Sequence, residues 1–148
     1  MGNVNKSLLE ELEALPFYRL KGPRSLGREW MEAELLPLIR KYRDRPVIEL
    51  LATYSEHIAL RIQAATERDT SGAMLVTGGG AYNDHLIGRL RKTGSPRIVL
   101  PEAQIIEFKE AMVFAFLGLL RLKGMNNVLG SVTGSGKDHS AGTISKPA

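Results

Sequence analysis

The sequence of 148 residues contains no cysteine, only 6% aromatic residues and no long apolar run. Without cysteine, disulfide frameworks, thiolate zinc sites and cysteine nucleophiles are excluded. The longest apolar stretch, residues 111–120, is far shorter than the roughly 20 residues that a bilayer-spanning helix needs. The first six residues lack the apolar core of a signal peptide. We therefore expect a cytoplasmic protein that has no membrane segment.

The remaining composition is that of a globular domain. Hydrophobic residues make up 43% of the chain and charged residues 24%, which is typical of a soluble, folded protein. A chain of this length buries roughly 68–70% of the surface that its unfolded form exposes. The 20 Lys and Arg residues outnumber the 16 Asp and Glu residues, but they occur in short, scattered clusters without a nucleic-acid-binding motif. We expect a solvated basic surface, with nucleic-acid binding as a weaker alternative.

A short helix and then a second helix are predicted near the N-terminus. A capping box at residues 7–10, SLLE, starts a helix that ends near Leu15 because a proline follows. Ser25 is expected to cap a second helix, which Pro37 kinks or breaks because proline lacks the amide donor. The apolar residues assigned to this second helix are Trp30, Leu35, Leu38 and Ile39.

A longer helix is predicted to begin at Pro46 and to end near Thr66, because proline is favoured at the first helical position. With a period of 3.6 residues, this helix has an apolar face of the kind that packs against a core. That face carries Val47, Leu50, Leu51, Tyr54, Ile58, Ile62 and Ala65. Residues 1–66 are thus expected to be the helical part of a single domain that spans residues 1–148.

Residues 67–123 are predicted to alternate strands with helices. Residues 73–77 form a short apolar run, which suits a strand covered on both faces, and residues 97–100 suit a second strand. A helix lies between these strands, and a long apolar helix over residues 108–123 follows them. This order predicts parallel pairing of the strands. Residues 124–148 are rich in Gly, Ser, Thr and Asn and are expected to be irregular.

Three consecutive glycines, Gly78, Gly79 and Gly80, separate the first strand from the next helix, which Asn83 is expected to cap. Backbone N–H groups at such a turn favour an anionic or nucleotide ligand, and the missing side chains let a flat ring or a phosphate come close. A tight turn that needs positive φ would also explain glycine here. Three glycines exceed what one turn requires, and both interpretations stay open.

Two common nucleotide-binding fingerprints do not fit the sequence. The dinucleotide pattern GxGxxG would need glycine where Asn83 stands. Residues 134–137, GSGK, resemble the end of a phosphate-binding P-loop, but Ser131 stands where its first glycine belongs and Asp138 replaces the metal-binding hydroxyl. No strand is predicted to precede this segment, so we interpret it as a flexible loop.

Glu107 and Glu110 are predicted to lie one helical turn apart at the start of the last helix, where the helix dipole stabilises negative charge. This pattern alone is most often ordinary chemistry of a helix start. The histidines share no metal-ligand spacing and are expected at the surface: His57, His85 and His139. A further apolar stripe on this helix is expected to pack in the core: Met112, Phe114, Phe116, Leu119 and Leu120.

Several of these segments together resemble the anhydro-N-acetylmuramic acid kinases, sugar kinases of the actin and hexokinase-like ATPase superfamily. The matching stretches occur in the family's order over nearly the whole chain: residues 23–30 (PRSLGREW), 75–83 (LVTGGGAYN), 108–111 (FKEA) with 114–117 (FAFL), and 127–134 (NVLGSVTG). The chain departs from the family's usual residues at Arg24, Gly130 and Ser145, where lysine, proline and an aromatic residue are common.

The resemblance implies an α/β fold, the ribonuclease-H-like C-terminal lobe of an actin-like ATPase, helix-rich with a short, mostly parallel sheet. In that family the segment containing Gly78, Gly79, Gly80 and Asn83 is the adenosine motif, which would lie against the nucleotide. The family uses ATP and Mg²⁺ to open the 1,6-anhydro ring with water while it phosphorylates O6. The product, N-acetylmuramic acid 6-phosphate, belongs to bacterial cell-wall recycling.

The resemblance also implies a role for Glu110, which matches the family's glutamate near the sugar and the catalytic centre. The family's glycine-rich phosphate loop and catalytic aspartate match no segment of this sequence. We therefore expect the C-terminal lobe of a longer kinase, as a fragment, a split gene or an expressed domain, which is inactive alone. Its expected partners are ATP, the anhydro-amino-sugar and the missing N-terminal lobe or a companion chain, and a homodimer is left open. The alternative is a non-catalytic interaction module that keeps the same lobe.

Overall fold

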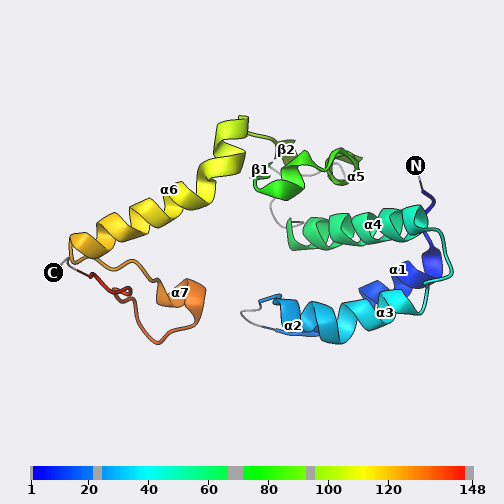
Figure 1. The fold of residues 1–148 in the computed structure, drawn as a ribbon, viewed down its shortest axis with the longest axis horizontal. Helices are drawn as coiled ribbons and strands as arrows, with labels where there is room; N and C mark the ends of the chain where they lie inside the picture. Colours follow the sequence, from blue (N-terminus) through cyan, green and yellow to red (C-terminus); the bar gives the residue numbers. More distant parts are fainter. Residues whose placement is uncertain (1, 22–24, 67–71, 93–95, 146–148) are drawn as a thin grey trace. The chain divides into compact units, whose positions relative to one another are not determined.

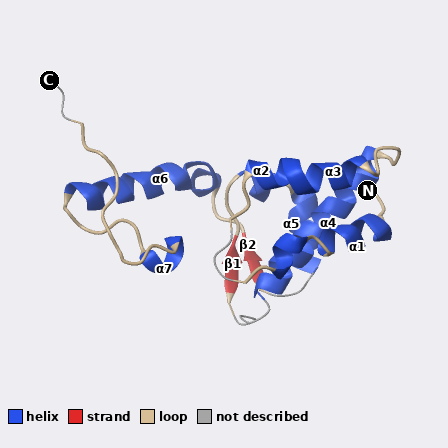
Figure 2. Cartoon of the chain, turned by 90° about the horizontal axis from the view of Figure 1, so that it is seen from below, coloured by secondary structure: helices blue, strands red, loops and turns tan. Residues whose placement is uncertain are grey.

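The computed structural model describes residues 2–21, 25–66, 72–92 and 96–145. The chain divides into two compact units, residues 1–102 and residues 103–148. The first unit combines helices with a small sheet, and the second consists of helices and loops (Figures 1 and 2). None of the described helices has the length and apolarity that crossing a bilayer demands.

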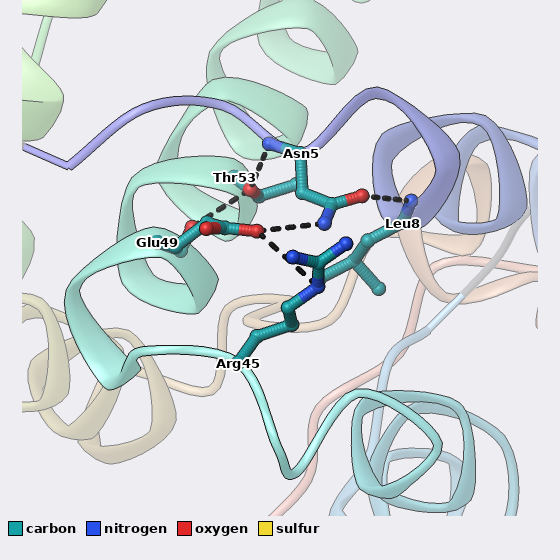
Figure 3. Close-up of polar contacts among 5 residues, drawn as sticks. All are labelled: Asn5, Leu8, Arg45, Glu49 and Thr53. Carbon is teal, nitrogen blue, oxygen red and sulfur yellow. Dashed lines mark hydrogen bonds and ion pairs between the residues drawn. The ribbon is translucent and has the colours of Figure 1, made fainter.

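The first helix, α1 (Lys6–Glu13), begins earlier than its capping box predicts. The cap is Asn5 instead of Ser7: the Asn5 side-chain oxygen accepts a hydrogen bond from the Leu8 N–H at 3.0 Å. Asn5 is fixed from α4 as well, because its own N–H donates to Thr53 Oγ1 at 2.9 Å and its amide group donates to Glu49 at 2.7 Å (Figure 3). These contacts, 44 and 48 residues away in the chain, select the cap.

The second predicted helix is a run of three short elements. After a 3₁₀ turn, η1 (Pro16–Arg19), the chain forms α2 (Arg28–Trp30), the π-helical segment η2 (Met31–Leu35) and α3 (Leu36–Arg40). The cap is Gly27, so the prediction of Ser25 as the cap is wrong. The α-helical pattern is interrupted near Pro37, which is the second residue of α3, directly after the π-helical segment, where its missing N–H costs little.

The helix α4 (Val47–Thr66) begins one residue after its predicted start and ends where predicted. Its predicted apolar face is only partly confirmed: Leu50, Tyr54 and Ile62 pack against the core, but other members do not. Val47 and Leu51 are 70% and 61% exposed. The fully covered positions are instead Ala52, Thr53, His57 and Ala59. The physical reason is that α4 packs against α1 on one side and α5 on the other, and small or hydrogen-bonded side chains allow both close approaches.

Among the described residues of this unit, two apolar clusters form the core. The first cluster joins α1 to the second helical run and is centred on Leu8, Leu12, Leu15, Leu35 and Leu38, with Trp30 packed against it. The second cluster lies between α4, α5 and the sheet and is centred on Ala59, Ile87 and Leu90. Leu35 and Leu38, two of the apolar residues assigned to the second helix, thus lie in the core.

The sheet has two strands, β1 (Ala73–Leu75) and β2 (Arg97–Val99), which pair in parallel with Met74 opposite Ile98 (Figure 2). The helix α5 (Asp84–Lys92) lies between them in the chain. Parallel pairing is confirmed. The prediction that both faces of the first strand are covered is wrong: Met74 packs into the second cluster, whereas Ala73 and Leu75 are exposed. The finding is a helix-rich chain with a short parallel sheet.

In the second unit, α6 (Ala103–Leu122) begins five residues before its predicted start and is followed by Gly124, which has φ +67°. The stripe expected in the core is largely exposed, with Phe114 at 71% and Met112, Phe116 and Leu119 also open. Residues 124–145 are mostly irregular, as predicted, apart from the single-turn helix α7 (Gly130–Thr133) and one antiparallel bridge between Val128 and His139.

Candidate functional site

The glycine turn, residues 78–80, connects β1 to α5. One residue beyond the strand, the Val76 N–H still donates to the Val99 carbonyl at 3.0 Å, and the chain then leaves the sheet. Gly78 has φ +75° and ψ −178°, a backbone region that is essentially restricted to glycine. A 3₁₀ turn, η3 (Gly79–Tyr82), follows, in which the Ala81 N–H donates to the Gly78 carbonyl at 2.9 Å. The turn therefore requires glycine at one position.

Gly79 and Gly80 meet no such requirement. Neither has a positive φ, and a Cβ added at either would find no atom within 4 Å. Gly130 is a contrasting case, because a Cβ there would lie 2.7 Å from the Ser135 carbonyl oxygen. Backbone conformation and packing thus explain Gly78 and Gly130 but not the middle of the glycine turn. What Gly79 and Gly80 provide is uncovered main chain that a ligand can approach closely.

Asn83 caps α5, as predicted. Its side-chain oxygen accepts from the Leu86 N–H at 3.1 Å and its carbonyl accepts from the Ile87 N–H at 2.9 Å. The oxygen of this side chain is therefore engaged, and its amide N–H groups are what remains for a ligand. Asp84 places a negative charge in the first turn of α5, where it already compensates the helix dipole. This end of the helix suits a neutral group better than a phosphate.

One side of the glycine turn is anchored in the core of the first unit. Ala81 is 4% exposed, and Ile87 and Leu90 of α5 are centres of the second cluster. Gly79, Gly80, Tyr82 and Asn83, by contrast, are exposed. A ligand that binds on the exposed side would therefore meet main chain that is already ordered.

Glu110 and Glu107 lie on α6 in the second unit, both exposed. Their spacing of three residues within a helix is confirmed. Their position at the helix start is wrong, because α6 begins at Ala103 and Glu110 lies more than a turn inside it. The dipole of the first turn therefore does not account for these carboxylates.

The chain was compared with known proteins. A family model described as anhydro-N-acetylmuramic acid kinase matches residues 1–147. The chain belongs to the anhydro-N-acetylmuramic acid kinase family. Kinases with this name are 32% identical over 97% of the chain in Hahella chejuensis, 35% over 92% in Gloeobacter violaceus and 34% over 90% in Xylella fastidiosa. The chain spans 40%, 38% and 36% of these relatives, about two fifths of their length.

The family's matching segments fall on distinct elements. The segment 75–83 is the end of β1 together with the glycine turn and the cap of α5, and the segment 108–117 lies within α6. The first segment, residues 23–30, includes residues 23 and 24, which lie outside the described residues. Within its described part, Arg28 pairs with Glu32 at 2.6 Å in an exposed ion pair.

The last segment, residues 127–134, contains Gly130. The Gly130 N–H donates to the Asp138 carboxylate at 2.8 Å, a bond that a proline at this position could not make. Asp138 is thereby committed to the main chain. The loop around residues 134–138 is further tied by Ser135, whose hydroxyl donates to the Lys137 carbonyl at 3.0 Å. This loop follows α7 and no strand, so the interpretation that it is not a P-loop agrees with the structure.

A polar cluster around the buried His57, which the sequence did not reveal, connects three segments of the first unit. His57 on α4 is 1% exposed, so its predicted surface position is wrong. Its Nδ1 faces Glu13 of α1 and its Nε2 lies 2.9 Å from the Tyr18 hydroxyl. Arg61 pairs with the second oxygen of Glu13 and stands over the Tyr18 ring, 5.2 Å from its centre. We assign the imidazole proton to Nδ1, since the carboxylate accepts and the tyrosine hydroxyl donates.

Burial lowers the pKa of His57 below its ordinary value, and the hydrogen bond to Glu13 opposes this effect without cancelling it. Burial also raises the pKa of the Tyr18 hydroxyl. A neutral imidazole and a protonated phenol are what this hydrogen-bond arrangement requires. The cluster fastens α1 and η1 to α4. The sequence pattern does not reveal this cluster, because its members, residues 13, 18, 57 and 61, come from segments that are far apart in the chain.

The other histidines and the carboxylates form no metal centre in the part of the chain that the structure describes, where no three His, Asp or Glu side chains are placed to hold a cation. His139 pairs its main chain with Val128, and His85 is half-buried on α5.

Proposed function

We propose that the chain is the C-terminal, ribonuclease-H-like nucleotide-binding lobe of an ATP-dependent kinase. This kinase would convert 1,6-anhydro-N-acetylmuramic acid to N-acetylmuramic acid 6-phosphate in cell-wall recycling. Membership of the family supports the activity, and the parallel strand pair with a glycine turn after its first strand supports the lobe. Since the chain spans about two fifths of its relatives, the whole reaction is assigned to the lobe together with an N-terminal lobe or companion chain.

The observation that carries the nucleotide site is the uncovered main chain at Gly79 and Gly80, which neither φ nor packing explains. We assign Gly78, Gly79, Gly80 and the amide of Asn83 to the adenosine part of ATP. The charge pattern supports this choice over the phosphates, because residues 78–84 contain no cation and carry the Asp84 carboxylate. The described residues offer no ligand cluster for Mg²⁺, and we assign none of them to the metal.

We assign Glu110 to the sugar side of the reaction, where its carboxylate would orient the attacking water or the ring oxygen by a hydrogen bond or by proton transfer. Phosphoryl transfer also needs aligned phosphates, a metal and a catalytic base. Those groups are assigned to the rest of the kinase. By itself the chain is expected to bind a nucleotide weakly and to transfer no phosphoryl group.

Calorimetric titration of ATP into the chain tests the site. Gly79→Val places a branched side chain over the uncovered main chain and is expected to weaken ATP binding at least tenfold, about 1.4 kcal/mol. Gly136→Val is the matched control, because Gly136 also has open space around it and no positive φ but lies in the 134–138 loop. It should leave ATP binding unchanged.

Equal ATP affinity in wild type and Gly79→Val would refute the assignment of the glycine turn. A folded wild-type chain that binds no ATP would instead favour the alternative, a non-catalytic interaction module. Glu110→Gln is expected to leave ATP affinity unchanged while it lowers turnover when the lobe is part of a complete kinase.

A further inference from the structure

Tyr82 lies beside the uncovered part of the glycine turn. A 3₁₀ helix has three residues per turn, so the side chains at positions i and i+3 lie above one another. In η3 (Gly79–Tyr82) this relation places Tyr82 on the same side of the turn as Gly79. Ala81 occupies a different side and is buried in the core. The turn therefore presents an aromatic residue next to a position that has no side chain.

The exposure of Tyr82 fits this placement. Its side chain is 54% exposed, although a tyrosine ring that serves only to fill a core would be covered. A Cβ at Gly79 or Gly80 would meet no atom within 4 Å, so the space over the main chain beside the ring is open. A planar ligand ring that lies over Gly79 would have peptide groups beneath it and the aromatic ring of Tyr82 within reach.

The charges around the turn favour a base over a phosphate for this position. The segment from Gly78 to Asp84 contains no lysine, arginine or histidine. Asp84 repels an anion at the start of α5, and the Asn83 side-chain oxygen is already used by the cap. An uncharged heteroaromatic ring, by contrast, binds through stacking, which needs no counter-charge.

We propose that Tyr82 is the base-stacking residue of the site and that its ring packs against the purine of a nucleotide lying over Gly79. The proposal rests on the nucleotide site proposed above and adds to it a residue that determines which part of the ligand is recognised. Tyr82 makes the turn selective for a nucleoside over a bare polyphosphate. Its hydroxyl is not required, since stacking uses the face of the ring.

Calorimetric titrations of ATP, adenosine and inorganic tripolyphosphate into the whole chain test this role. Tyr82→Leu removes the aromatic face and keeps an apolar side chain of moderate size. It is expected to weaken the binding of ATP and of adenosine by about tenfold, which is within the range of base-to-aromatic stacking. Tyr82→Phe keeps the ring and is expected to remain within twofold of wild type for both ligands.

The outcomes separate this proposal from the nucleotide site itself. If wild type binds ATP and Tyr82→Leu binds it equally tightly, the stacking role fails while the site stands. If wild type binds neither ATP nor adenosine, the site itself fails. Any binding of tripolyphosphate should be the same in wild type and Tyr82→Leu. An equal loss for tripolyphosphate and ATP would overturn the stacking role, because a general disturbance of the turn would then explain both.

Discussion

Replacing His57 by glutamine is expected to remove a pH-dependent part of the free energy of unfolding. His57 is buried on α4 between Glu13 and Tyr18, and burial lowers the pKa of its imidazole below the ordinary 6.5. Unfolding exposes the imidazole to water and restores its ordinary pKa. The native and unfolded chains therefore bind different numbers of protons at mildly acidic pH.

The direction and the size of the pH effect on the free energy of unfolding follow from this difference in proton binding. Above pH 6.5 the imidazole is neutral in both states and contributes no pH dependence. Between pH 6.5 and the lower native pKa, only the unfolded chain takes up the proton. The free energy of unfolding therefore falls as the pH falls, by up to about 1.4 kcal/mol for each pH unit in that window. Below the native pKa of His57, its contribution becomes constant again.

Urea unfolding between pH 7.5 and pH 5 measures this slope. Trp30 is the only tryptophan and packs against the first cluster, with ring centres 5.4 Å from Phe17 and 6.4 Å from Tyr18, so its fluorescence reports unfolding of this unit. His57→Gln should flatten the slope, whereas His139→Gln, the same change in the other unit, should preserve it. A wild-type free energy that is constant from pH 6.5 to pH 5, or a slope that survives in His57→Gln, would refute the reasoning.

Two further predictions concern the stability of the first unit and are measured by the same urea unfolding. Thr53→Val should destabilise the chain by about 1–3 kcal/mol because the Asn5 N–H loses its acceptor (Figure 3). Thr53→Ser keeps the hydroxyl and should cost clearly less. Equal losses of stability in the two variants would contradict the role of this hydrogen bond. Gly78→Ala should cost about 1–3 kcal/mol because of its backbone conformation, and Gly79→Ala should change stability by less than about 0.5 kcal/mol; a similar cost at both positions would mean that the whole turn, not one residue, requires glycine.

The parts of the fold that the sequence predicts well are those decided by local chemistry. Pro46 marks the start of α4, Asn83 caps α5 and Gly124 follows the end of α6, because each of these residues has a backbone or side-chain property that acts within one helical turn. The parallel pairing of β1 and β2 also follows, since a helix between two strands brings them side by side in the same direction.

Long-range contacts explain where prediction from the sequence fails. Ser7 and Asn5 are both good caps, and the choice between them is made by Thr53 and Glu49 on α4, which no local pattern reveals. Hydrophobic periodicity also expects apolar residues at buried positions, so it misses His57, whose burial depends on hydrogen-bond partners from distant segments. For α6 the signal is ambiguous in another way, because residues 111–120 are apolar all round and give no unique face.

The difference between local and long-range interactions also decides how much of the candidate site can be predicted from the sequence. The conformation of the glycine turn is local, and a strand, a run of glycines and an N-cap are enough to predict it. The sequence shows that three glycines exceed what one turn requires, but only the structure shows which are in excess: of the three, Gly78 has the positive φ, and the space over Gly79 is open. Because Ala81, Ile87 and Leu90 hold the turn from the core side, binding there would cost little ordering of the chain. The affinity of the proposed site should therefore be set by the contacts that the ligand makes, and Tyr82 is the large side chain placed to add one.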